Sequence, residues 1–221
     1  MKSLLFFLFA FITFGLIAPQ NALACACCAE AGTYLIRTGK VDTYELGLLG
    51  EMKFDKDAAL YMTEAGFDGI KGLSELAKDF ESESWTAAPA DFDLVNVFTA
   101  KTWKFNFKTP TGKSGVLTLP MPSQMLQFKV DIHDNSDNGL GPSLYKEWRF
   151  KGIVSSGTGI FKSSIIRPTS YFLVLQGRGN GCDNAEDFTH WHLEITGKRA
   201  NYEFFGELSS GAVEETESPG N

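Results

Sequence analysis

Residues 187–196 read DFTHWHLEIT, and this stretch indicates the fold class of the chain. Its apolar and polar side chains alternate one by one, which is the pattern of a β-strand with one face against a core. The apolar positions are Trp191, Leu193 and Ile195, and the polar positions are His190, His192 and Glu194. The next stretch of chain has the composition of a partner strand.

The chain can turn at Gly197 and Lys198, which offer a two-residue hairpin loop. The register that follows places apolar side chains opposite apolar ones on one face and mainly polar side chains together on the other. The predicted apolar pairs are Ile195 with Ala200, Leu193 with Tyr202, and Trp191 with Phe204. The pairs predicted on the other face are Glu194 with Asn201, His192 with Glu203, and His190 with Phe205.

The same period of two recurs along most of the chain, and short turn signals separate the segments that carry it. In residues 124–133, the side chains of one face are Leu126, Phe128, Val130 and Ile132, and those of the other are Met125, Gln127, Lys129, Asp131 and His133. Further strands are predicted near residues 92–98, 101–108, 114–119, 145–154 and 170–177.

The region before these strands contains a change of period. Residues 44–54 are predicted as a strand, a turn follows at Asp55 and Lys56, and residues 58–63 are predicted to return. Apolar residues then recur at spacings of three and four, which is typical of a helix with one apolar face. They are Phe67, Ile70, Leu73, Leu76, Ala77 and Phe80. The sequence predicts one short amphipathic helix near residues 68–81.

So many antiparallel strands must close on themselves or stack in layers, because exposed sheet edges promote association. The predicted fold class is therefore all-β, a mainly antiparallel barrel or two-sheet sandwich, with the one helix beside it. No repeat and no linker divides the strands, so residues 25–210 are predicted to form a single β-rich domain.

The two ends of the chain have compositions of their own. Lys2 precedes an apolar run, and the small residues Ala22 and Ala24 fit a cleavage site. This pattern predicts a secretory signal peptide over residues 1–24 and a periplasmic or secreted protein. Residues 211–221 are acidic and lack apolar periodicity, and they are predicted to be disordered. No other stretch is long and apolar enough to predict a transmembrane segment.

His190 and His192 are the basis of a predicted metal site. Residues two apart on a strand project to the same side, so both imidazoles can reach one ion. Glu194 continues that face, and Glu203 is predicted opposite His192. Two imidazoles with a carboxylate suit a transition-metal ion, and copper or zinc is the expected cofactor. His133 lies on the polar face of its own strand and is a candidate additional ligand.

Three of the four cysteines, Cys25, Cys27 and Cys28, follow the predicted cleavage site, and Cys182 lies far away in the sequence. Disulfides persist in exported proteins, so a bridge from one of the three to Cys182 is the first interpretation. Cysteines close in sequence rarely pair with each other, because the bond needs Cα atoms roughly 5.5 Å apart. Two alternatives stay open: thiolates that bind Cu(I) or Zn²⁺, and a lipid anchor on Cys25.

The function predicted from these features is that of an exported binding module whose ligand is a transition-metal ion held by the His-x-His strand. One alternative is a metal-dependent enzyme that uses the same histidines with an open coordination position. The other is a structural or interaction protein of the cell envelope without a ligand. No catalytic residue is assigned. The net charge of −7 argues against a nucleic-acid partner, whose phosphates require a basic face.

Overall fold

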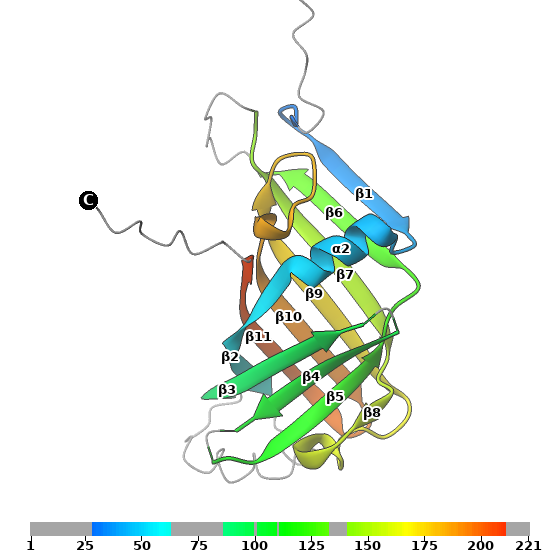
Figure 1. Cartoon of the computed structure of the whole chain (residues 1–221), viewed down its shortest axis with the longest axis vertical. Helices are drawn as coiled ribbons and strands as arrows, with labels where there is room; N and C mark the ends of the chain where they lie inside the picture. The colour runs from blue at the N-terminus through cyan, green and yellow to red at the C-terminus, as the bar shows by residue number, and fades with distance from the viewer. Residues whose placement is uncertain (1–27, 63–85, 100, 110, 133–140, 211–221) are drawn as a thin grey trace, which may run out of the picture.

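The computed structural model describes residues 28–62, 86–99, 101–109, 111–132 and 141–210. The predicted signal peptide, the predicted helix near residues 68–81, His133 and the predicted disordered tail lie outside these residues. The described part of the chain forms one antiparallel sheet of 11 strands with one α-helix. Figure 1 shows how these elements are arranged.

The regular elements follow one another along the chain with few long connections. They are β1 (Tyr34–Gly39), α2 (Thr43–Glu51), β2 (Met52–Met62), β3 (Thr86–Phe98), β4 (Thr102–Lys108), β5 (Ser114–Pro120), β6 (Met125–Asp131), β7 (Leu144–Ile153), β8 (Ser156–Gly157), η1 (Gly159–Phe161), β9 (Thr169–Gly179), η2 (Ala185–Asp187), β10 (Phe188–Gly197) and β11 (Ala200–Ser210). In space the strands are ordered β1-β6-β7-β9-β10-β11-β2-β3-β4-β5-β8.

The sheet folds over on itself in two layers without closing into a barrel. β4 packs on β7, where the rings of Trp103 and Phe150 meet edge to face with centroids 5.0 Å apart. It also packs on β11, where Phe107 and Phe204 stack at 4.1 Å. In Figure 1, β3, β4 and β5 accordingly cross in front of the longer strands. The all-β antiparallel prediction is confirmed, and of its two architectures the sandwich-like one is found.

Large aromatic side chains from both layers fill the space between them. The aromatic side chains that are at most 1% exposed are Trp103, Phe105, Phe107, Trp148, Phe150, Phe161, Phe188, Trp191, Tyr202 and Phe204. Burying a Phe side chain completely contributes roughly 1.5–3 kcal/mol. The apolar positions predicted for residues 187–196 lie in this core.

The prediction of a strand over residues 44–54 is wrong for its first part, which forms α2. Asp42 caps the helix by accepting hydrogen bonds from the backbone N–H groups of Tyr44 and Glu45. The Glu45 carboxylate in turn accepts from the Asp42 N–H at 2.6 Å. This capping box satisfies the first backbone donors of the helix, and so it favours helix over strand. Its Asp-x-x-Glu signal is present in the sequence.

The turn predicted at Asp55 and Lys56 is also wrong, because β2 runs without interruption from Met52 to Met62. The pairing of β2 with β11 is irregular at one point, where the register shifts between Gly206 and Leu208. Such a bulge bends a strand and leaves it in the sheet.

β10 and β11 form the predicted hairpin, but the register differs from the prediction by two residues. The turn consists of Lys198 and Arg199, and Gly197 pairs with Ala200. A shift of two leaves every side chain on its predicted face, because the side-chain period of a strand is two, and it changes only the partners. The predicted pairs were therefore wrong in detail, although the faces are right.

In β6 the polar side chains face the interior and the apolar side chains face outward, which is the reverse of the usual arrangement in a strand. Gln127, Lys129 and Asp131 are buried, and the apolar positions between them are only partly covered. One apolar side chain of the outer face, Phe128, packs against Tyr34 with ring centroids 5.8 Å apart. Polar groups inside a protein need partners, so this strand requires a polar network in the interior.

Candidate metal centre on the last hairpin

The outer face of β10 carries the predicted metal ligands, and the inner face holds the strand in the core. Trp191, Leu193 and Ile195 are each at most 1% exposed. On the outer face His192 and Glu194 are half-buried and His190 is exposed.

The imidazole of His192 is held between two aromatic rings. It stacks on Phe205, the residue directly opposite on β11, with centroids 5.1 Å apart and an interplanar angle of 14°. It also meets Phe172 edge to face at 6.3 Å. These contacts bury the Nε2 atom, which has no hydrogen-bond partner among the described residues. An unsatisfied buried polar atom costs about 1–3 kcal/mol, and coordination to an ion would satisfy it.

Glu194 lies directly opposite Glu203 across the hairpin. Like charges in this position destabilise a pair of strands. No Lys or Arg in the described residues lies within 4.0 Å of either carboxylate; the nearest basic group is His192, whose Nε2 lies 3.6 Å from Glu203 Oε2. The Thr196 hydroxyl donates a hydrogen bond to Glu194 Oε1 at 2.7 Å, which orients the carboxylate and leaves its charge uncompensated.

The three groups converge closely enough to share one ion. Each of the residues His192, Glu194 and Glu203 offers one ligand atom, and these three atoms lie within 4.8 Å of one another. A tetrahedral Zn²⁺ with bonds of about 2.1 Å separates its ligand atoms by roughly 3.4 Å, so modest side-chain rotations bring these groups to bonding distance. One imidazole and two carboxylates suit Zn²⁺ better than Cu(I), which prefers thiolates. They also leave a coordination position for water.

His190 does not join this group. It follows a register shift between β9 and β10 and lies opposite Glu207 on β11. Its Nδ1 is 2.8 Å from the hydroxyl of Thr189. Its side chain lines a separate cleft of about 460 Å³ together with Asp55, Asp57 and Glu207. The structure therefore brings His192, but not His190, together with the two carboxylates that were predicted to bind one ion.

Several predicted ligands lie outside the described residues, namely His133, Cys25 and Cys27. Cys28 is exposed, and it does not lie within disulfide distance of Cys182. A bridge from Cys25 or Cys27 to Cys182, a soft-metal site and a lipid on Cys25 all stay predictions.

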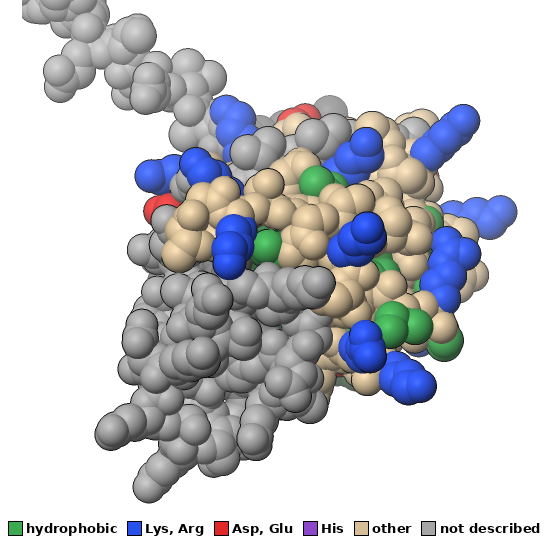
Figure 2. Space-filling model, turned by 90° about the horizontal axis from the view of Figure 1, so that it is seen from below, with side chains coloured by type: hydrophobic (Ala, Val, Ile, Leu, Met, Phe, Trp, Pro, Cys, Tyr) green, Lys and Arg blue, Asp and Glu red, His purple; other side chains and the backbone are tan. Residues whose placement is uncertain are grey.

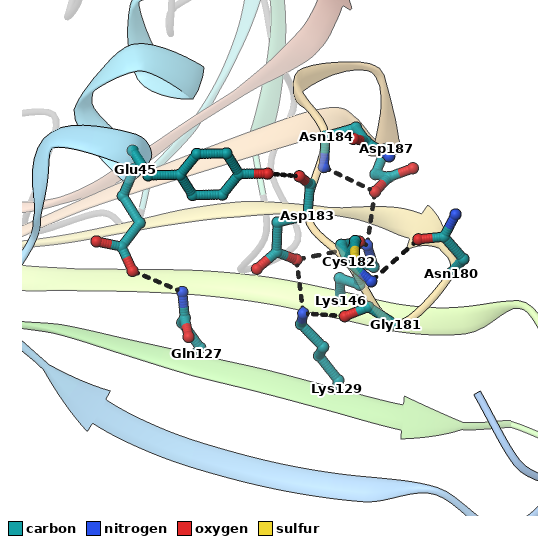
Figure 3. A network of polar contacts seen from close by, with 11 residues as sticks. Glu45, Gln127, Lys129, Lys146, Asn180, Gly181, Cys182, Asp183, Asn184 and Asp187 are labelled. Atoms are coloured by element: carbon teal, nitrogen blue, oxygen red, sulfur yellow. Dashed lines mark hydrogen bonds and ion pairs between the residues drawn. The ribbon is translucent and has the colours of Figure 1, made fainter. Parts of the chain in front are cut away.

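The interior of the sheet holds a second ionic cluster, which Figure 3 shows. Lys129 on β6 and Lys146 on β7 lie directly opposite each other, and both point inward. Lys146 Nζ is 2.5 Å from Asp187 Oδ2 and 3.4 Å from Asp183 Oδ1. Lys129 Nζ is 2.9 Å from the same oxygen of Asp183. Two lysines and two aspartates therefore compensate one another.

This cluster anchors the loop that leads into β10. The ammonium groups donate to two backbone carbonyls of that loop, Lys129 to Gly181 at 2.7 Å and Lys146 to Cys182. The Asn184 N–H donates to the Asp187 carboxylate at 3.0 Å. The start of the strand that carries His192 is thus positioned by buried charges.

The reasoning from sequence missed the four charged residues of this cluster, although a signal for them existed. Lys146 occupies an alternate position of β7 together with Leu144, Trp148 and Phe150, all of them core residues. A lysine in such a series is either misassigned or paired in the interior, since lysine is almost never buried alone.

No protein-family model, no curated protein and no solved structure matches this chain. Within the described residues, no helix has the length and apolar character needed to cross a membrane. The site is therefore interpreted from its own geometry.

Proposed function

We propose that the chain is a binding module for a divalent transition-metal ion, with Zn²⁺ as the ion that fits best. The ligands are His192, Glu194 and Glu203. The observation that carries this proposal is the pair of carboxylates placed directly opposite each other without a compensating cation among the described residues. A divalent ion between them turns a repulsive contact into a cohesive one.

An ordinary solvated surface accounts less well for the same geometry. A surface ion pair between His192 and Glu203 contributes about 0.2–1 kcal/mol, and the repulsion of Glu194 and Glu203 has a similar size with the opposite sign. Such a surface gives no reason for a buried imidazole nitrogen that lacks a hydrogen-bond partner among the described residues. Metal coordination accounts for the nitrogen and the carboxylates together.

A metal-dependent enzyme is the second candidate, and the cleft beside the site favours it. Phe205 contacts His192 and also lines the cleft that contains His190 and Glu207. An ion with an open coordination position activates water, and an exposed imidazole nearby can accept a proton. No substrate class follows from the lining residues.

The test is a titration of the chelator-treated protein with Zn²⁺, Cu²⁺ and Mn²⁺, followed by calorimetry and by metal analysis after gel filtration. His192→Ala is expected to lower the affinity by on the order of 100-fold, and Glu203→Gln by at least about tenfold. His190→Ala is the matched control, because it removes an exposed histidine from the same strand. Binding that survives both His192→Ala and Glu203→Gln, for instance at the cysteines, contradicts the proposal.

We also infer from the sequence that the chain is exported and that residues 1–24 are removed. A disulfide from Cys25 or Cys27 to Cys182 then fastens the mature N-terminus to the loop that the buried cluster anchors. The intact mass of protein purified from the exporting cell, measured with and without reductant, tests cleavage and the bridge. The same mass reveals a lipid on Cys25.

A further inference from the structure

Among the described residues, those at one end of the molecule are mainly basic, although the chain as a whole carries a net charge of −7. Figure 2 views this end from below and shows many Lys and Arg side chains with few Asp or Glu. The β10–β11 turn, η1 and the segment that enters β9 meet there: Gly197 pairs with Thr169, and the Ser164 hydroxyl contacts the Tyr202 hydroxyl at 3.0 Å.

We define the basic face by five exposed cations, which are Lys151, Lys162, Arg167, Lys198 and Arg199. None of the five forms an ion pair with a carboxylate of the described residues. Arg167 donates a hydrogen bond to the Ser155 carbonyl at 3.1 Å, which holds its guanidinium on this end. The charge of the face is therefore available to an external partner.

The sequence segregates charge in the same way. Residues 94–130 contain five lysines and neither Asp nor Glu. Residues 148–181 contain five Lys or Arg residues and again no acidic residue. Lys151, Lys162 and Arg167 of the basic face belong to the second segment, whereas Lys129 of the first pairs with Asp183 in the interior and Arg149 of the second pairs with Glu147. The three exposed cations have no carboxylate in their own segment, and they contribute to a positive potential of the face.

Exposed aliphatic side chains lie among these cations. Ile166 is 38% exposed and directly precedes Arg167, and Ile153 is 48% exposed at the end of β7, two residues after Lys151. Apolar side chains are visible between the basic ones in Figure 2. A polyanion in water gains little from aliphatic contacts, whereas a bilayer surface uses both kinds of residue. Lys and Arg attract anionic headgroups, and aliphatic tips enter the headgroup boundary.

We propose that the basic face docks on an anionic lipid bilayer. The β10–β11 turn and the loop around Arg167 contact the headgroups, and Ile153 and Ile166 insert between them. The binding is peripheral and reversible, because a few exposed cations and two aliphatic side chains supply the whole contact.

Co-sedimentation with vesicles tests the proposal. The unlipidated mature protein, verified by intact mass, is mixed with phosphatidylcholine vesicles that contain phosphatidylglycerol or lack it. Binding is expected only with phosphatidylglycerol and is expected to weaken as salt is raised, since the Debye length falls. Each cation contributes about 1 kcal/mol at such a surface, so Lys162→Gln with Arg167→Gln lowers the partition coefficient by roughly tenfold or more.

A matched double variant, Lys40→Gln with Lys53→Gln, makes the same change of charge at exposed positions outside the face and is expected to bind like the parent. Ile166→Ser is expected to weaken binding at high salt, where the electrostatic contribution is screened. The proposal is overturned if the parent does not bind anionic vesicles, if the two double variants behave alike, or if duplex DNA or a sulfated polysaccharide competes fully with the vesicles at equal charge.

Discussion

Two pairs of like charges face each other across neighbouring strands, one inside the sheet and one outside. Lys129 and Lys146 are opposite each other in the interior, and Glu194 and Glu203 are opposite each other on the outer face. The lysines have two aspartates within ion-pair distance. Within the described part of the chain, the basic neighbour of the glutamates is the His192 imidazole, whose buried Nε2 has no hydrogen-bond partner there.

The difference follows from burial. Lys146 is 0% exposed, so its charge must be compensated by the protein itself, because an unpaired ion in the interior costs several kcal/mol. The side chains of His192 and Glu203 keep 24% and 32% of their surface exposed, so solvent screens the Glu203 charge and an ion can enter. The inner cluster compensates its own charges, and in our proposal a bound ion completes the outer one.

The largest expected effect comes from breaking the inner cluster. Lys146→Met leaves two buried carboxylates with one lysine and is expected to lower the free energy of unfolding by about 3–5 kcal/mol. Urea denaturation measures this loss. Lys162→Met, at an exposed lysine, is the control and is expected to change stability by no more than about 0.5 kcal/mol. Equal effects of the two variants would remove the distinction between the clusters.

The next effect is the completion of the outer cluster. Zn²⁺ at about 100 times its dissociation constant is expected to raise the free energy of unfolding by about 2.7 kcal/mol. Chelator should reverse the gain, and His192→Ala should abolish it while Lys146→Met retains it. Thermal or urea unfolding at several ion concentrations measures the effect. A gain that persists in His192→Ala would place the ion elsewhere.

A smaller effect has opposite signs in the two clusters. Without metal, Glu203→Gln removes the repulsion with Glu194 and is expected to stabilise the protein by about 0.2–1 kcal/mol. Asp183→Asn in the inner cluster is expected to destabilise it, because two buried lysines lose a shared partner. Denaturation in the presence of chelator compares them. Destabilisation by Glu203→Gln under these conditions would show that the two carboxylates do not repel each other.

The smallest effect concerns Glu45, a buried carboxylate that accepts a hydrogen bond from the Gln127 amide at 3.1 Å and lies beside the Asp42 carboxylate. Burial raises the pKa of Glu45, whereas the backbone hydrogen bond from Glu45 lowers the pKa of Asp42. A raised carboxyl pKa means that the folded state binds the proton more tightly, so this contribution to stability is lost as pH rises through that pKa.

Glu45→Gln is therefore expected to lose less stability than the parent as pH rises from the ordinary carboxyl pKa of 4.5 through the raised pKa of Glu45. Glu51→Gln, an exposed change on the same helix, is the control and is expected to follow the parent. Unfolding curves collected across this range measure the slope. A steeper loss in Glu45→Gln would mean that the carboxylate is stabilised as an anion.

The candidate metal centre could be predicted from sequence only in part. The alternation of residues 187–196 placed His192 and Glu194 on one face correctly, and the hairpin brought Glu203 to the same face. His190 was assigned to the same site because strand geometry alone puts it there. The irregular pairing after Phe188 and the cleft around His190 depend on strands far away in the sequence.

The helix α2 shows the opposite case, in which local information was sufficient. The Asp42–Glu45 capping box is a four-residue signal, and it outweighs the alternation of Tyr44, Leu46 and Leu48 that suggests a strand. The inner cluster needed more than local information, because its lysines and aspartates come from two strands and a loop.

The sequence by itself determined most of the strands after residue 90, the face on which each hairpin side chain lies and the segregation of charge along the chain. These properties follow from the side-chain period of two and from the composition. They stay the same when one strand shifts by two residues against its neighbour. Only the tertiary structure decided the register that sets Glu194 against Glu203, and only it turned the polar face of β6 inward to meet Lys146. Register and burial depend on the packing of all 11 strands at once, because each pairing is selected by the core that the whole sheet encloses.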